Sequence, residues 1–111
     1  MSQYLKKLKQ LDPLKLPKDQ YAIFGSGPLA IRGLRNTLDI DLIVLPDLWD
    51  GLRSRYPKEL SPLGAIEIKD IEIFQEWMAL TPKIEKMIKT AEMISGYPFV
   101  RLDYVLEWKR K

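Results

Sequence analysis

Apolar side chains recur at helical spacing near the start of the chain. Between residues 2 and 11 they stand three or four positions apart, and lysines occupy the other side. This spacing predicts an amphipathic helix that packs on the rest of the protein, with Ser2 as a candidate N-cap and Asp12-Pro13 as its end. A lysine-rich surface for RNA is the alternative interpretation of the same residues.

Two apolar runs predict central strands. The first is Tyr21–Phe24, which leads into glycines, and the second is Asp39–Leu45, which becomes continuously apolar and β-branched after its acidic residues. Such runs are typical of buried strands. A short helix is expected to begin at Pro28, capped by Ser26 or Gly27. A further helix should follow the second strand, from residue 47 to about residue 56.

The isoleucines between residues 65 and 74 change parity. They stand at positions 66, 68, 71 and 73. Because side chains alternate between the two faces of a strand, one regular strand cannot bury all four. We therefore predict two short strands, separated by a tight turn or a bulge near Lys69-Asp70. Glu72 should then point away from the isoleucines that flank it.

The last third of the chain predicts two helices. Thr81-Pro82 supplies an N-cap and a proline for the first turn, and apolar residues at helical spacing continue toward Gly96. An extended connection over residues 97–100 precedes a terminal helix. In that helix we expect Leu102, Val105 and Leu106 to share one side.

These elements predict an α/β (α+β) fold with a small mixed sheet of about four strands flanked by helices. The 111 residues are expected to form a single domain, with the N-terminal helix in residues 1–12 and the core in residues 20–111.

Composition narrows the possible chemistry. The chain has no cysteine and no histidine, so thiolate nucleophiles, imidazole acid–base catalysis and Cys- or His-ligated metals are excluded. It lacks both a signal-peptide pattern and an apolar run of about 20 residues, so we expect a cytoplasmic protein with no membrane partner. A net charge of +3 is compatible with a phosphate-bearing ligand.

Two short motifs combine chemistry that suits a nucleotide. In a strand, Asp39 and Asp41 would point to the same face with Cα atoms roughly 6.5 Å apart, where their like charges repel. A hard divalent cation removes that repulsion, because Mg²⁺ prefers carboxylate oxygens alongside substrate phosphates. The turn at Gly25-Ser26-Gly27 offers backbone N–H groups to those phosphates.

At these residues the chain resembles the DNA polymerase beta-type nucleotidyltransferase superfamily. The resemblance rests on Gly25-Ser26, twelve intervening residues, and Asp39-x-Asp41 between apolar neighbours. The run Gly33-x-Arg35-x-Thr37-x-Asp39-Ile40-Asp41 looks like the small prokaryotic members that often occur in toxin–antitoxin pairs. It covers roughly residues 20–110 and implies a nucleotidyltransferase-like fold.

The resemblance implies metal-dependent transfer of a nucleoside monophosphate from an NTP, with ATP as the expected nucleotide, to a protein or RNA hydroxyl. Asp39 and Asp41 would hold Mg²⁺ or Mn²⁺, and Gly25 and Ser26 would bind phosphates. Arg35 would either reach the triphosphate or pair with an aspartate.

The superfamily carries a third carboxylate on a later strand, between apolar residues. Ile71-Glu72-Ile73 matches that pattern, so Glu72 is expected to complete the catalytic and metal-binding set with Asp39 and Asp41. Glu67, which also lies between isoleucines, is the second candidate. Both glutamates would instead face solvent if the hairpin is purely structural.

A second function class stays open. The chain carries no obvious acceptor-recognition segment and has Glu in place of the commoner third Asp. The alternative to an enzyme is therefore a catalytically inert module of the same fold, which acts by binding a partner protein or a second copy of itself.

Overall fold

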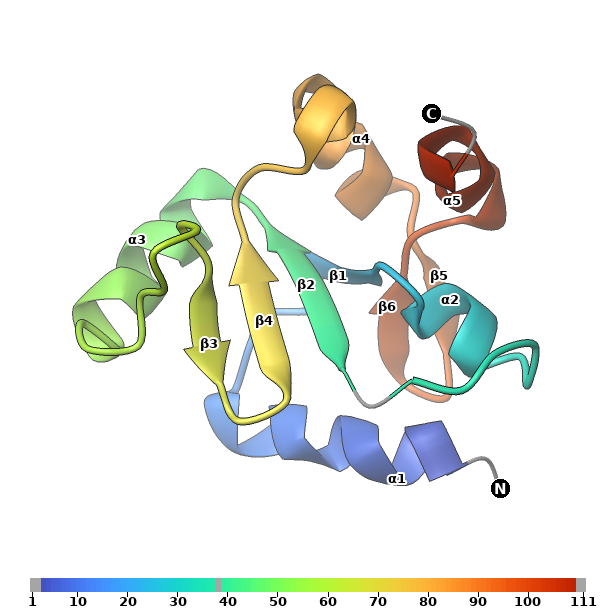
Figure 1. Cartoon of the computed structure of the whole chain (residues 1–111), viewed down its shortest axis with the longest axis horizontal. Helices are drawn as coiled ribbons and strands as arrows, with labels where there is room; N and C mark the ends of the chain where they lie inside the picture. Colours follow the sequence, from blue (N-terminus) through green and yellow to red (C-terminus); the bar gives the residue numbers. More distant parts are fainter. Residues whose placement is uncertain (1–2, 38, 110–111) are drawn as a thin grey trace.

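A computed structural model of the chain describes residues 3–37 and 39–109, and these residues form an α/β fold around a six-stranded sheet (Figure 1). The strands are β1 Tyr21–Phe24, β2 Ile40–Val44, β3 Ile66–Ile68, β4 Ile71–Phe74, β5 Glu92–Ile94 and β6 Tyr97–Phe99. The helices are α1 Gln3–Leu8, α2 Gly27–Ala30, α3 Pro46–Arg55, α4 Ile84–Lys89 and α5 Leu102–Lys109, with 3₁₀ segments η1 Lys9–Leu14 and η2 Met78–Lys83.

The sheet is mixed and open, with the strand order β3-β4-β2-β1-β6-β5. Three antiparallel pairs, β1/β2, β3/β4 and β5/β6, are joined side by side through the parallel pairs β2/β4 and β1/β6. The two edge pairs are hairpins with short turns, as antiparallel neighbours allow. The strands that carry the predicted site, β1, β2 and β4, therefore lie in the middle of the sheet.

One face of the sheet packs against α1, η1 and α3 through a large apolar core. Its buried side chains come from alternate strand positions, such as Ile40 and Leu42 of β2, and from Leu8 of α1. Figure 1 shows α1 running beneath the sheet at the end where β2 and β4 begin. Since the helix buries Tyr4 and Leu8 and exposes Lys6, the amphipathic helix predicted from the sequence is present.

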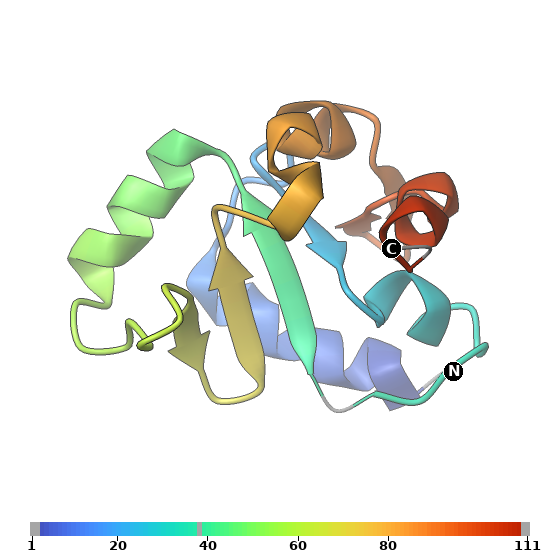
Figure 2. The ribbon, with the colours of Figure 1, turned by 45° about the horizontal axis from the view of Figure 1, so that its top comes forward.

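The opposite face packs against η2, α4 and α5 and contains a cluster of contacting aromatic rings. Phe24 and Trp77 have ring centroids 4.7 Å apart, and Trp108 of α5 lies 5.2 Å from Trp77. Tilted and edge-on ring pairs at these distances are favourable beyond the area that they bury. Figure 2 shows α4 beside the end of β2, whereas the start of β2 has no helix in front of it within the described residues.

The sheet has six strands, not the four predicted, because the segment after α4 forms a hairpin that joins it. The predicted helix toward Gly96 ends at Lys89, and residues 92–94 form β5 instead. Ser95 and Gly96 have φ angles of 52° and 88°, the left-handed values that a two-residue hairpin turn requires. Residues 97–99, expected to be a connection, are the strand β6.

Several boundaries also differ from the sequence prediction. Asp39 precedes β2, which begins at Ile40. Asp12-Pro13 does not end the first helical segment, since η1 continues to Leu14 with Pro13 inside it. In α5 the predicted face is wrong at one position: Val105 is fully buried and Leu106 is 54% exposed. The predicted N-cap Ser2 lies outside the described residues.

The prediction of two short strands separated by a turn near Lys69-Asp70 is confirmed. β3 and β4 are separated by Lys69-Asp70, and Lys69 has a φ of 54°.

Within the described ranges, no helix is long and apolar enough to cross a membrane.

Candidate functional site

The turn after β1 lies directly against Asp41 of β2. Phe24 and Asp41 are paired residues in the antiparallel ladder, so the next residue, Gly25, turns past the Asp41 side chain. Gly25 has a φ of +62°, and a Cβ added there would lie 2.2 Å from Oδ2 of Asp41. Only glycine fits both the left-handed backbone and the close approach of the carboxylate. The two predicted motifs are therefore in contact.

A row of three carboxylates crosses the sheet beside this turn. The parallel ladder pairs Asp41 with Glu72, and the β3/β4 hairpin pairs Glu72 with Glu67. Paired residues lie on the same face of a sheet, and neighbouring strands are about 4.8 Å apart. The structure thus brings Asp41 next to Glu72, the first choice for the third carboxylate. It also places Glu67, the second choice, on the far side of Glu72 in the same row.

Burial and mutual repulsion raise the pKa values of two carboxylates in this row. The pKa of Asp41 is raised to about 7, chiefly by burial and then by the negative charges of Glu72 and Asp39. The pKa of Glu72 is also raised, first by desolvation and then by Glu67 and Asp39. Repulsion between neighbouring carboxylates therefore adds to the effect of burial in both groups.

Asp39 belongs to the same electrostatic cluster without sharing the strand. Its side chain is exposed, and its backbone N–H donates a 3.2 Å hydrogen bond to Oγ1 of Thr37. Its charge contributes to the raised pKa of both Asp41 and Glu72, so it lies near both of them. The structure therefore gathers Asp39, Asp41 and Glu72 into one region, with Asp39 on a loop.

The donor set suits a hard cation, whereas the side-chain positions are not those of a formed metal site. Carboxylate oxygens are ligands that Mg²⁺ and Mn²⁺ accept, and a Cβ at Gly25 would fill the space that the Asp41 carboxylate occupies. Within the described residues, no three acidic side chains are placed so that they could hold one ion. Binding would require these carboxylates to turn toward one another.

Ser26 stands at the N-cap position of α2, yet its hydroxyl makes no capping hydrogen bond. The side chain is half-buried, and Pro28 occupies the first turn of the helix, as predicted. The hydroxyl of Ser26 is consequently available to a ligand beside Gly25. The helix is only four residues long, so its dipole adds little.

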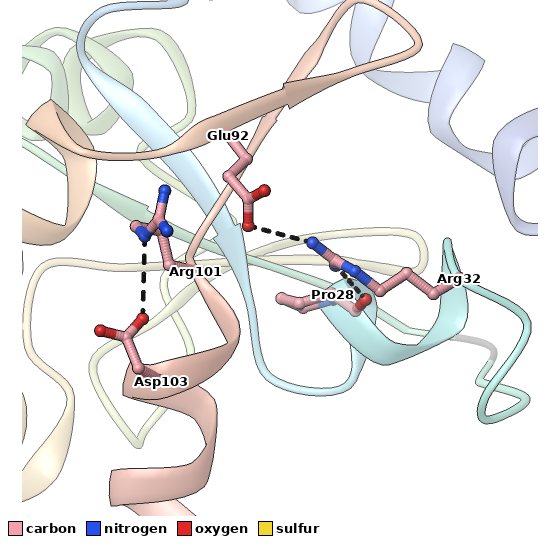
Figure 3. Close-up of polar contacts among 5 residues, drawn as sticks. All are labelled: Pro28, Arg32, Glu92, Arg101 and Asp103. Atoms are coloured by element: carbon pink, nitrogen blue, oxygen red, sulfur yellow. Dashed lines mark hydrogen bonds and ion pairs between the residues drawn. The ribbon is translucent and has the colours of Figure 1, made fainter.

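Arg32 holds α2 in place (Figure 3). Its Nη1 donates a 2.6 Å hydrogen bond to the carbonyl of Pro28, and its Nη2 forms a 3.0 Å ion pair with Glu92 of β5. The neighbouring pair of Arg101 and Asp103, at 3.9 Å, belongs to the start of α5. Arg32 is thus engaged in structure and is not free for a phosphate.

Arg35 makes no polar contact with the carboxylate row within the described residues. It is exposed, and within the described residues no hydrogen bond or ion pair holds it. The predicted pairing of Arg35 with an aspartate is therefore absent there. Its side chain lines a pocket between α1 and the loop that follows α2, together with Lys6 and Lys7.

Sequence reasoning missed Tyr4 as a member of this region. It was assigned only to the apolar stripe of the first helix, and it is 6% exposed. Its hydroxyl lies where a Cβ of Gly27 would clash, 2.6 Å away, and has no hydrogen-bond partner among the described residues. Burial and the charges of Asp41 and Asp39 raise the pKa of Tyr4. The available signal was a tyrosine in a stripe otherwise made of leucines.

Comparisons with known proteins identify no relative. No family model matches the chain, and neither the curated proteins nor the solved structures include a significant match.

Proposed function

We propose that the chain transfers a nucleoside monophosphate from an NTP, in the first instance ATP, to a hydroxyl of a protein or RNA, with Mg²⁺ or Mn²⁺ bound at the carboxylates. The observation that carries the proposal is the direct pairing of Asp41 with Glu72 beside the Gly25 turn. Adjacent carboxylates with raised pKa values, next to free backbone N–H groups, suit a phosphate and a cation together.

Each residue has a distinct task in this proposal. Asp41, Glu72 and Asp39 would hold the metal, which when bound neutralises phosphate charge and favours ionisation of the acceptor hydroxyl. Gly25 and Ser26 would bind the outer phosphates through backbone N–H groups and the free Ser26 hydroxyl. Arg35, on its exposed loop, would neutralise charge from the side of α1.

The transfer itself needs little covalent chemistry from the protein. The acceptor oxygen bonds to the α-phosphorus, and the bond from that phosphorus to the bridging oxygen breaks. Pyrophosphate leaves, and the hydroxyl proton passes to a carboxylate of the row or to water. Glu72 is half-buried in the middle of the row, between Asp41 and Glu67, and would meet the incoming acceptor beside Asp41.

The test is to incubate the protein with α-labelled NTPs, Mg²⁺ and cell lysate, and to follow the label into protein or RNA. Asp41→Asn and Glu72→Gln should each abolish labelling, while Glu72→Gln should keep most of the NTP–Mg²⁺ affinity measured by calorimetry. Glu76→Gln, an exposed glutamate outside the row, is the matched control and should label like the wild type. Labelling that survives in Asp41→Asn would refute the assignment.

Glu67→Gln separates the two candidates for the third carboxylate. Because Glu67 pairs with Glu72 across the hairpin, its removal should lower the pKa of Glu72 and change activity only modestly. Loss of labelling in Glu67→Gln but not in Glu72→Gln would exchange their roles.

A binding module is the second candidate function, and one observation favours it. The carboxylates of the described residues do not form a group able to hold an ion as placed. If calorimetry detects no Mg²⁺ or Mn²⁺ binding and no NTP is consumed, the fold acts by binding a partner protein or a second copy of itself.

A further inference from the structure

A pocket of about 1190 Å³ lies between α1 and the loop that follows α2. Its lining is shared between two segments far apart in sequence, with Gln3, Tyr4, Lys6 and Lys7 from α1 and Ala30, Gly33, Arg35, Asn36 and Thr37 from the other wall. The carboxylates of the row are not part of this lining. The pocket is therefore distinct from the candidate metal site, although Tyr4 connects the two regions.

The pocket is lined by three cationic side chains and by no acidic residue among those described. Lys7 is paired with Asp70 at 2.7 Å, which leaves its charge largely balanced. Lys6 and Arg35 have no hydrogen bond or ion pair within the described chain. Two uncompensated cations on opposite walls favour an anion between them.

Neutral hydrogen-bonding groups complete the lining. Gln3, Asn36 and Thr37 offer amides and a hydroxyl, which suit the hydroxyls of a sugar or the edge of a base. Tyr4 also lines the pocket, but its hydroxyl is buried against Gly27, which is not part of the lining.

We propose that this pocket binds the phosphate group of a small phosphorylated molecule without a divalent cation. Lys6 and Arg35 contact the phosphate oxygens from the two walls, and Arg35 does so with the forked geometry that guanidinium groups offer to phosphate. The inference goes beyond the proposed transfer, because it requires none of Asp39, Asp41 and Glu72. It gives Arg35 a ligand whether or not the chain is an enzyme.

The first experiment measures binding by calorimetry in buffer freed of divalent cations, with inorganic pyrophosphate and ribose 5-phosphate as separate probes. We expect the Lys6→Gln/Arg35→Gln double variant to lose at least tenfold in affinity. Lys58→Gln/Lys86→Gln removes the same charge from exposed positions outside the pocket and should change affinity less than twofold. Equal losses in the two double variants, or no binding by the wild type at millimolar probe, would overturn the proposal.

The two probes identify the source of the phosphate. Tighter binding of ribose 5-phosphate assigns the neutral lining residues to a sugar, and tighter binding of pyrophosphate assigns an inorganic ligand.

One further variant separates this inference from the proposed transfer. Asp41→Asn should bind pyrophosphate in metal-free buffer as well as the wild type, while it abolishes labelling from NTP. If no variant ever labels an acceptor but the pocket variants lose pyrophosphate as expected, the transfer fails and the pocket stands. The reverse pattern refutes the pocket alone.

Discussion

Asp41 and Leu42 are consecutive residues of β2 that face opposite sides of the sheet. Leu42 is fully buried in the core between the sheet and α1, whereas Asp41 is half-buried on the side covered by α4 and α5. On the α1 side the apolar surface is continuous from β3 to β6. On the other side the apolar cover ends along β2, since Ile43 packs in the core under α4 and α5 and Asp41 does not.

The difference shows where this fold can place charge. A fully covered core can hold only apolar side chains, because a buried carboxylate without a partner is strongly destabilising. The side with incomplete cover keeps one end of β2 and β4 within reach of water, and there the carboxylates gather. The candidate site therefore lies where the apolar core under α4 and α5 ends.

The largest effect should come from the closed side. Leu42→Ala removes a fully buried side chain between two layers and should lower the free energy of unfolding by about 2–5 kcal/mol. Denaturant unfolding of the variant and the wild type measures the loss. A loss below about 1 kcal/mol would mean that this core is as loosely covered as the other, which would remove the contrast.

A smaller effect is expected at the boundary between the turn and the row. Gly25→Ala combines a left-handed backbone with a Cβ 2.2 Å from Oδ2 of Asp41, and should cost about 1–3 kcal/mol. Gly64→Ala is the matched control, because Gly64 has a φ of +86° but open space around its Cβ. Asp41→Ala should recover part of the Gly25→Ala loss in a double-mutant cycle. Identical losses at Gly25 and Gly64 would show that the carboxylate contact is unimportant.

An effect of opposite sign is expected at Asp41 itself. Its folded pKa of about 7 lies above the usual value of 3.8, so the folded protein keeps a proton that the unfolded chain releases. Stability should therefore fall as the pH rises from about 4 to about 7, and level off above that. Asp41→Asn keeps the neutral shape and should remove this decline.

In metal-free buffer, the melting temperature of Asp41→Asn should equal that of the wild type near pH 4 and exceed it near pH 8. Asp50→Asn, at an exposed position in α3, serves as the control. A lower melting temperature for Asp41→Asn at pH 8 would mean that the carboxylate is structural.

The central strands could be predicted because their apolar runs leave one interpretation. β1 and β2 are buried on both faces, and the parity change among the isoleucines required a turn at Lys69-Asp70. The hairpin of β5 and β6 could not, since Glu92–Ile94 is only three residues long and follows α4 in helical spacing. A short edge strand is defined by its partner rather than by its own sequence.

The candidate site was only partly accessible to sequence reasoning. Spacing alone put Asp39 and Asp41 on one strand, but β2 begins one residue after Asp39. The pairing of Glu67 with Glu72 depends on the hairpin register, and the contact of Asp41 with Gly25 depends on a side-chain position that no pattern specifies. The hydroxyl of Tyr4 was hidden by the apolar role of its ring.

The parallel pairing of β1 with β6 affects how the protein folds during its synthesis. Ile23 pairs with Phe99, which the ribosome adds about 75 residues later. At the usual rates of synthesis that interval lasts about 4–15 s. During this interval one edge of the apolar strand β1 stays unpaired. An unpaired strand edge is a template for wrong pairing with other chains. Nascent chains of this protein should therefore depend on chaperones until β6 emerges.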